Sequence, residues 1–146
     1  MITKNFSHSE IACPCCGNTN IDPAIVEIAQ RIRDELGQPV YVPEGGGKRC
    51  DKYHNAIGKY YSAHQTGQAI DLYVKPYRFE TMLKIARLGN KFKAGRIGLY
   101  PDYAVKSVHL DLWKPSPSEA WVRVGRGYIY FRKFESAVKF VEENYL

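Results

Sequence analysis

The sequence has no long hydrophobic segment. Nowhere in its 146 residues does it approach the roughly 18 consecutive apolar residues that a membrane-spanning helix needs. Residues 1–12 are polar and mixed, and they lack the apolar stretch behind a basic start that is typical of a secretory signal peptide. We therefore expect no membrane span, and a protein that is synthesised in the cytoplasm and leaves it only by another route.

Positive charge is not concentrated anywhere in the chain. Lys and Arg number 21 against 15 Asp and Glu, which gives a formal net charge of +6, but the basic residues are scattered. A modest positive excess favours anionic partners in general, whereas a dedicated nucleic-acid site would need clustered basic residues. The chain also lacks repeats and low-complexity segments, and 45% of its residues are hydrophobic and 25% charged. We expect one globular domain spanning residues 1–146, present as a monomer.

Cysteine is scarce, and its placement leaves three interpretations open. Cys13, Cys15 and Cys16 are close in the sequence, whereas Cys50 is remote. Reduced thiols are the default for a chain without an export signal. A disulfide from the cluster to Cys50 is the second interpretation. The third is a structural zinc site, because Cys13-x-x-Cys16 followed by Cys50-x-x-x-His54 has a plausible ligand spacing.

The sequence does contain two segments that combine histidine with aspartate. His64 and Asp71 lie in one of them, and His109 and Asp111 lie in the other. Successive strand residues point to opposite faces, so His109 and Asp111 should share one face while the apolar residues around them point into the core. Two imidazoles and two carboxylates on strand-like segments are suitable donors for a zinc site with an open coordination position. They favour a hydrolase over a passive binding domain.

The order of these residues resembles a known family. Ser62-x-His64-x-x-Gly67-x-Ala69-x-Asp71, followed by a strand with His109-x-Asp111, is similar to the zinc D-Ala-D-Ala carboxypeptidases and endopeptidases that cut peptidoglycan stem peptides. The most similar branch of this peptidase M15-like family is the short phage and bacterial one. The resemblance covers about residues 6 to 113. It includes these further motifs: Phe6-Ser7-x-Ser9-Glu10, Cys13-Pro14-Cys15-Cys16-Gly17, Ile21-Asp22-Pro23, Arg49-Cys50 and His54-Asn55.

The resemblance implies a zinc metallopeptidase. Zinc would be the cofactor, with His64, Asp71 and His109 as its ligands, and a peptidoglycan peptide would be the substrate. The protein would act on the cell wall after release from the cell or as part of a phage particle. Whether it is a carboxypeptidase or an endolysin-type endopeptidase stays open. The alternative from another class is a non-catalytic wall-binding or phage-particle structural protein on the same scaffold.

The residue that carries the catalytic proton is less well defined. Several branches of the similar family have a carboxylate three residues before the last histidine ligand, but Lys106 occupies that position here. Asp111 is the nearest replacement. We expect it either to be catalytic, as a proton shuttle, or to orient a ligand imidazole. Asp102 and Glu44, in predicted loops, are the reserve candidates.

Arg49 and Ser62 are the predicted substrate-binding residues. Similar enzymes carry an arginine at the place of Arg49, and we predict a catalytic role for this residue as well. A guanidinium can hold a substrate carboxylate through two parallel hydrogen bonds. The preceding residues are Gly46-Gly47-Lys48 instead of the usual Ser-Gly-Tyr, so the pocket around Arg49 should differ. Ser62 should either bind substrate or brace the loop that carries His64.

Alternating helix and strand signals predict the fold. Asp22 as an N-cap, Pro23 at the first helical position and Gly37 as a stop delimit one helix. Further helices are predicted at 77–88 and 134–145, and strands at 40–42, 69–74, 97–100, 107–113, 121–124 and 128–131. The glycine loop 44–47 should allow close approach or mobility. We expect an α+β fold with a central, mainly antiparallel sheet and flanking helices, similar to zinc D-Ala-D-Ala carboxypeptidases and hedgehog-type domains.

Overall fold

A five-stranded sheet lies at the centre of the molecule. The computed structural model describes residues 1–57 and 61–146. The strands are β1 (Ala69–Leu72), β2 (Arg96–Leu99), β3 (Val108–Asp111), β4 (Ala120–Val124) and β5 (Gly127–Phe131). Their order in the sheet is β1-β3-β2-β4-β5, and all neighbours are antiparallel except the pair β2 and β4. The predicted α+β fold with a mainly antiparallel sheet and flanking helices is confirmed.

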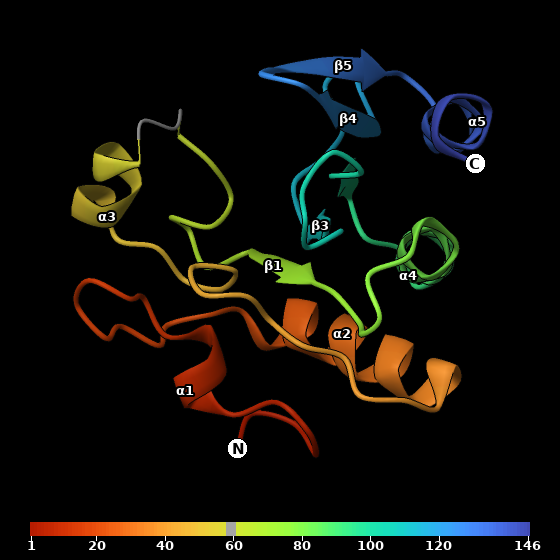
Figure 1. Cartoon of the computed structure of the whole chain (residues 1–146). Helices are drawn as coiled ribbons and strands as arrows, with labels where there is room; N and C mark the ends of the chain where they lie inside the picture. Colours follow the sequence, from red (N-terminus) through yellow and green to blue (C-terminus); the bar gives the residue numbers. More distant parts are fainter. Residues whose placement is uncertain (58–60) are drawn as a thin grey trace.

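Three helices cover one face of this sheet. The α2 helix (Pro23–Leu36) contacts β1, α4 (Phe79–Lys91) contacts β2 and β3, and α5 (Phe134–Tyr145) contacts β4 and β5. Figure 1 shows α3 (Asp51–Ala56) standing apart from this helical layer, while α1 (His8–Ile11) lies near the N-terminus. The apolar layer between helices and sheet includes the fully buried residues Ile25, Ile32, Leu83, Ile85, Ile97, Leu99 and Leu110.

The boundaries of the long helices follow local signals. Asp22 accepts a hydrogen bond from Ala24 N at 2.9 Å, Pro23 begins α2, and Gly37, with a φ of 67°, ends it. The α5 helix spans its predicted range. The α4 helix runs past its predicted end at residue 88. It continues to Lys91 through Gly89, which packs closely against the sheet: a Cβ atom there would lie only 2.6 Å from Leu110 Cδ2.

Some predicted elements differ from the structure. The predicted strand at 40–42 is reduced to an isolated bridge between Tyr41 and Tyr73, because Pro43 follows and has no N–H group to extend the ladder. The short helices α1 and α3 were not predicted. Each is too short for a repeating apolar pattern to reveal it. The predicted hairpin is present as β4 and β5.

The predicted alternation along β3 is confirmed. Val108 and Leu110 are buried in the core that faces the helices. His109 and Asp111 point to the opposite face, where His109 Nε2 lies 2.8 Å from Asp111 Oδ2. We call this opposite side the open face of the sheet. The candidate active site lies on this open face.

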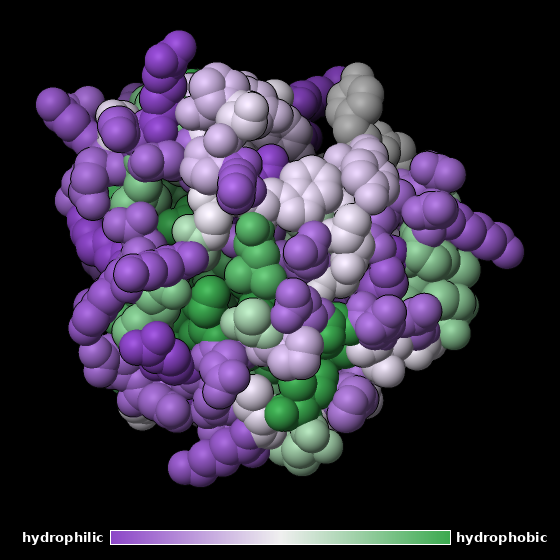
Figure 2. Space-filling model, turned by 180° about the vertical axis from the view of Figure 1, so that it is seen from behind, coloured by the Kyte–Doolittle hydropathy of each residue, from purple (hydrophilic) through white to green (hydrophobic). Residues whose placement is uncertain are grey.

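One face of the molecule is mainly hydrophilic (Figure 2). Figure 2, seen from behind, shows hydrophilic side chains over most of that face and hydrophobic ones only in patches between them. None of the helices in the described part of the chain combines the length and the hydrophobicity needed to cross a bilayer.

Candidate active site

A row of residues crosses the open face of the sheet. Its members lie opposite one another on neighbouring strands, in the order Asp71, His109, Gly98, Trp121 and Tyr130. The Trp121 indole fills the space over Gly98, where a Cβ atom would overlap the ring. It thereby reaches His109, with 5.0 Å between the ring centroids. The register of the sheet thus places a carboxylate and an imidazole side by side, next to an aromatic wall.

His64 reaches this row from the loop that precedes β1. The loop turns back at Gly67, whose φ of 75° favours glycine and where a Cβ atom would overlap the Asn20 carbonyl oxygen. The backbone N–H of His64 donates to Ser62 Oγ at 3.3 Å. These constraints place His64 Nε2 3.3 Å from Asp71 Oδ1. Gly67 therefore brings the two residues of the first motif together.

The three glycines of the loop 44–47 are buried and support the site. The Gly46 carbonyl accepts a hydrogen bond from Asp71 N at 2.8 Å, and the Gly47 carbonyl lies 2.9 Å from His64 Nδ1. A Cβ atom at Gly47 would lie 2.5 Å from the Ile11 carbonyl oxygen. Of the two expected uses of this loop, the structure shows close approach of the backbone.

Three donor atoms converge above the row. His109 Nδ1 lies 3.1 Å from Asp71 Oδ1 and 3.2 Å from His64 Nε2. His64 Nε2 lies 3.3 Å from the same carboxylate oxygen. Nitrogen and oxygen ligands of a tetrahedral zinc ion are separated by roughly 3.3–3.4 Å. The structure therefore brings the three predicted ligands together at a spacing that suits zinc.

The outer nitrogen of each histidine is held by an acceptor. Because the Gly47 carbonyl can only accept, His64 Nδ1 carries the proton and Nε2 presents its lone pair to the centre. His109 Nε2–H donates to Asp111, which leaves Nδ1 facing the centre. Such partners fix the tautomer and raise the basicity of a metal-binding imidazole. The donor set therefore fits a zinc ion.

The clustered charges shift the acid–base behaviour of these residues. Burial lowers the pKa of His64, and Asp71 only partly offsets that effect. Burial also acts to lower the pKa of His109, but hydrogen bonds to Asp111 and Asp71 outweigh it and raise this pKa to about 9. Burial acts to raise the pKa of Asp71, yet His64 and His109 hold it far below its usual range. The space between the donor atoms of His64, Asp71 and His109 is therefore favourable for a positive charge, which a metal cation can supply.

Asp111 lies behind His109 and is fully buried. Arg96 Nη2 and Nε donate to its Oδ2 at 2.7 and 3.0 Å, and the Trp113 backbone N–H donates to Oδ1 at 3.0 Å. The Arg96 guanidinium lies between the rings of Trp113 and Trp121, 4.9 and 5.1 Å from their centroids. Both oxygens of Asp111 thus accept hydrogen bonds. They lie on the Nε2 side of His109, whereas Nδ1 faces His64 and Asp71.

Arg96 and Trp121 were not among the predicted site residues. The alternation along residues 96–99 indicates that Arg96 shares a face with Gly98, but it does not say which residue lies opposite. Only the pairing of β2 with β3 places Arg96 across from Asp111. Only the pairing of β2 with β4 places Trp121 over Gly98.

Comparison with known proteins assigns the family. The profile described as Peptidase M15 matches residues 4–111, which include the three ligand residues and Asp111. The chain belongs to the Peptidase M15 family. A comparison with curated proteins found no match. The family resemblance drawn from the motifs is confirmed, and the family indicates a peptidase.

Arg49 and Ser62 of this M15 chain both line a cleft into which the three predicted ligand residues also open. Arg49 Nε donates to the Gly45 carbonyl at 2.6 Å, and Arg49 Nη2 lies 3.5 Å from Asp71 Oδ2. Ser62 Oγ is engaged by the His64 backbone N–H. The structure therefore brings both predicted substrate-binding residues beside the ligand set.

The reserve acid candidates lie elsewhere. Asp102 is exposed and accepts a hydrogen bond from Gly125 N at 2.6 Å, and Glu44 is exposed on the glycine loop. Lys106 donates to the Tyr103 carbonyl at 3.3 Å. Within the described part of the chain, Asp71 is the one carboxylate that lines the cleft.

The three ligand residues open onto a cleft of about 650 Å³. On one side it is lined by His54 and Ile57 at α3, and on the other by Tyr128 and Tyr130 of β5. Four arginines also line it: Arg49, Arg96, Arg123 and Arg126. The cleft therefore extends to both sides of the three predicted ligand residues and is strongly basic.

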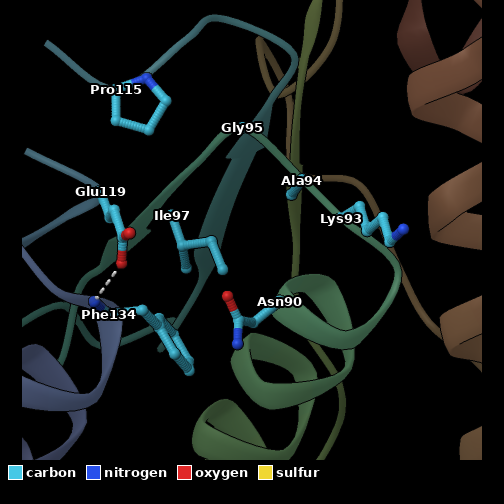
Figure 3. A pocket seen from close by; sticks show the side chains of 8 residues that line it. All are labelled: Asn90, Lys93, Ala94, Gly95, Ile97, Pro115, Glu119 and Phe134. Atoms are coloured by element: carbon cyan, nitrogen blue, oxygen red, sulfur yellow. Dashed lines mark hydrogen bonds between the residues drawn. The ribbon is translucent and has the colours of Figure 1, made fainter.

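A smaller cavity of about 280 Å³ lies between the end of α4 and the start of α5. Figure 3 shows Glu119 linked to Phe134 there, with Asn90 and Ile97 beside them. Glu119 Oε2 accepts a hydrogen bond from Phe134 N at 2.9 Å, which satisfies a free N–H group at the start of α5. Glu119 thus caps the start of α5 at the wall of this cavity.

Proposed function

We propose that this protein is a zinc-dependent peptidase that hydrolyses peptide bonds in peptidoglycan stem peptides or their cross-links. The observation that carries the proposal is the convergence of donor atoms of His64, Asp71 and His109 within 4.8 Å of one another. They line an open cleft, as expected for a catalytic site with three protein ligands rather than a closed structural one. Membership of the Peptidase M15 family supports peptidase chemistry.

The chain supplies the ligands and the groups that orient them. A zinc ion held by these residues would supply Lewis-acid polarisation of the scissile carbonyl and activation of water. The Gly47 carbonyl holds the ring of His64, and Asp111 holds the ring of His109. Hydrogen bonds to the Gly46 and Gly47 carbonyls hold Asp71 and His64 in place beside each other.

Asp111 is best suited to a positioning role. Its carboxylate is fully buried and engaged by Arg96, by the Trp113 N–H and by His109 Nε2. It faces the side of the imidazole that points away from the other ligands. Of the two roles expected from the sequence, these contacts favour orientation of the His109 ring over proton transfer.

Arg49 is the proposed anchor for a substrate carboxylate. Its guanidinium lies in the cleft next to Asp71, so a bound carboxylate would be held close to the ligand set. Arg123 and Arg126 add positive charge on the far side of the cleft. Stem peptides carry several carboxylates, and a guanidinium fork binds such groups through paired, charge-assisted hydrogen bonds.

The extent of the cleft favours cleavage of an internal bond. Lining residues lie on both sides of the ligand set, from α3 to the hairpin β4–β5. A carboxypeptidase needs space for only one residue beyond the scissile bond, whereas an endopeptidase must hold chain on both sides of it. We therefore favour endopeptidase action over removal of a terminal D-Ala.

Mass spectrometry of fragments released from purified peptidoglycan tests these proposals. Wild-type protein with zinc should release fragments with new peptide termini, and a chelator should stop the release. His64→Ala should be inactive, while His8→Ala, which changes an exposed histidine on α1, should behave as wild type. Release of free D-Ala alone would contradict the endopeptidase assignment, and unchanged activity with a chelator would contradict the zinc mechanism.

One observation favours the non-catalytic alternative. The described part of the cleft offers no carboxylate besides Asp71, which is itself a proposed ligand. The same experiment separates the two functions, because a wall-binding protein would sediment with peptidoglycan and bind zinc without releasing any fragment.

A further inference from the structure

A second cluster of metal-binding side chains lies outside the catalytic cleft. The sulfur atoms of Cys13, Cys16 and Cys50 lie within 4.8 Å of one another. All three thiols are free. Cys13 is buried, Cys50 is half-buried and Cys16 is exposed, so the cluster is reached from one side. None of these cysteines is among the residues that line the cleft.

Backbone hydrogen bonds close the turn that follows Cys13. Gly17 N donates to the Cys13 carbonyl at 2.8 Å, and Cys13 N donates to the Asn18 carbonyl at 2.9 Å. Gly17 has a φ of 73°, which lets the chain close this tight turn. The turn brings the Cys16 sulfur within 4.8 Å of the Cys13 sulfur.

Cys50 completes the cluster from a distant part of the chain. Its backbone N–H donates to Cys13 Sγ at 3.3 Å, and its own sulfur accepts from Tyr53 N at 3.4 Å. Lys48 N also donates to the Ile11 carbonyl at 2.8 Å, which fixes the approach of the two segments. N–H donors around sulfur stabilise the thiolate form, and buried negative charge needs a cationic partner.

A disulfide would not account for this arrangement. One disulfide joins two sulfur atoms, whereas three converge here. Three thiolates in one place match the sulfur-rich sites that bind zinc tetrahedrally in proteins. The exposed Cys15 is outside this group of three. His54, the fourth residue of the predicted zinc motif, is outside it as well and lines the cleft instead.

We propose that Cys13, Cys16 and Cys50 bind a second, structural zinc ion. This ion would tie the turn 13–18 to the segment that leads into α3. Arg49 directly precedes one of the ligands, and α3 carries His54 at the edge of the cleft. The structural zinc would therefore hold the Arg49 side of the cleft in place without taking part in hydrolysis.

Metal content and cobalt spectroscopy on the full chain test the proposal independently of enzymatic activity. Wild-type protein should contain two zinc ions per chain, and the double variant His64→Ala/His109→Ala should retain one. Cobalt(II) loaded into that double variant should give a thiolate-to-cobalt charge-transfer band. A cobalt complex without this band, or an intact mass showing a disulfide in freshly purified protein, would overturn the proposal.

Two matched serine variants in the same background identify the ligands. Cys16→Ser removes an exposed proposed ligand, so the fold is least affected. It should weaken cobalt binding by more than the ~10- to 100-fold that loss of an outer hydrogen-bonding partner costs. Cys15→Ser, one position away, should keep the band with at most a smaller loss of affinity. Equal binding by Cys16→Ser and the parent would contradict the assignment.

Discussion

The two faces of β3 have different roles, one in the hydrophobic core and the other at the candidate active site. Val108 and Leu110 point into the apolar core against the helices, whereas His109, a proposed zinc ligand, and Asp111, its partner, point to the open face. Residues adjacent in sequence are thus separated by the thickness of the sheet. Substitutions on one face should change stability, and substitutions on the other should change metal binding and catalysis. Neighbouring positions on one short strand therefore provide an internal test of the site.

The largest effect is expected on the open face. His109→Ala removes a ligand, so zinc binding should be lost and hydrolysis should fall by about 10³-fold or more, since the ion supplies several kcal/mol of transition-state stabilisation. Zinc content and fragment release measure this effect, and circular dichroism should show a native-like fold. An active, zinc-loaded His109→Ala protein would remove His109 from the ligand set.

The neighbouring position should behave differently. Leu110 is fully buried in the core, so Leu110→Ala should lower the free energy of unfolding by about 2–5 kcal/mol. Zinc stoichiometry and activity should stay near wild type at temperatures where the variant is folded. Urea unfolding and metal analysis on the same preparation check this. A stable Leu110→Ala protein that fails to bind zinc would contradict the separation of the two faces.

Substitution of Arg49 should affect substrate binding without loss of the metal. Arg49→Ala should cost about 1.5–3 kcal/mol of substrate binding, as expected for a charge-assisted hydrogen bond. The effect should appear as a higher KM for substrates with a carboxylate near the scissile bond. Arg49→Lys is the matched control, because it keeps the charge and loses the planar fork. Wild-type kinetics from Arg49→Ala would exclude Arg49 from the site.

Asp111→Asn distinguishes the two roles expected for this carboxylate. As a positioning residue, its loss should weaken zinc affinity by about 10- to 100-fold and leave kcat at saturating zinc close to wild type. Zinc titration and steady-state kinetics on the same protein provide the measurement. A kcat reduced about 100-fold with zinc affinity intact would instead identify Asp111 as the proton shuttle.

The smallest expected effect is a pH-dependent difference in the metal-free protein. The pKa of His109 is raised from 6.5 to about 9, with Asp111 a main cause. A raised folded-state pKa gives stability that is complete below about pH 6.5 and is lost as the pH rises through about 9. The stability advantage of wild type over Asp111→Asn should therefore be largest below pH 6.5 and shrink towards pH 9. Urea unfolding with chelator present tests this, and a constant difference would contradict it.

Sequence patterns predicted most of the ligand chemistry. The spacing around His64 and Asp71 and the alternation around His109 identified three side chains that the structure brings together. These residues were accessible to prediction because their motif is short and their strands alternate regularly. Arg96 was not, since its place in the site depends on which strand pairs with β3. The choice between the two roles of Asp111 also required the contacts of its buried carboxylate.

The sequence by itself determined the α2 and α5 helices, the two faces of β3 and the candidate ligands, because capping, periodicity and motif spacing act over a few residues. Only the tertiary structure decided the parallel pairing of β2 with β4, the packing of Trp121 over Gly98, and the meeting of Cys50 with Cys13. Those contacts join segments far apart in the chain. They are set by how the helices and the sheet pack together, which no local pattern encodes.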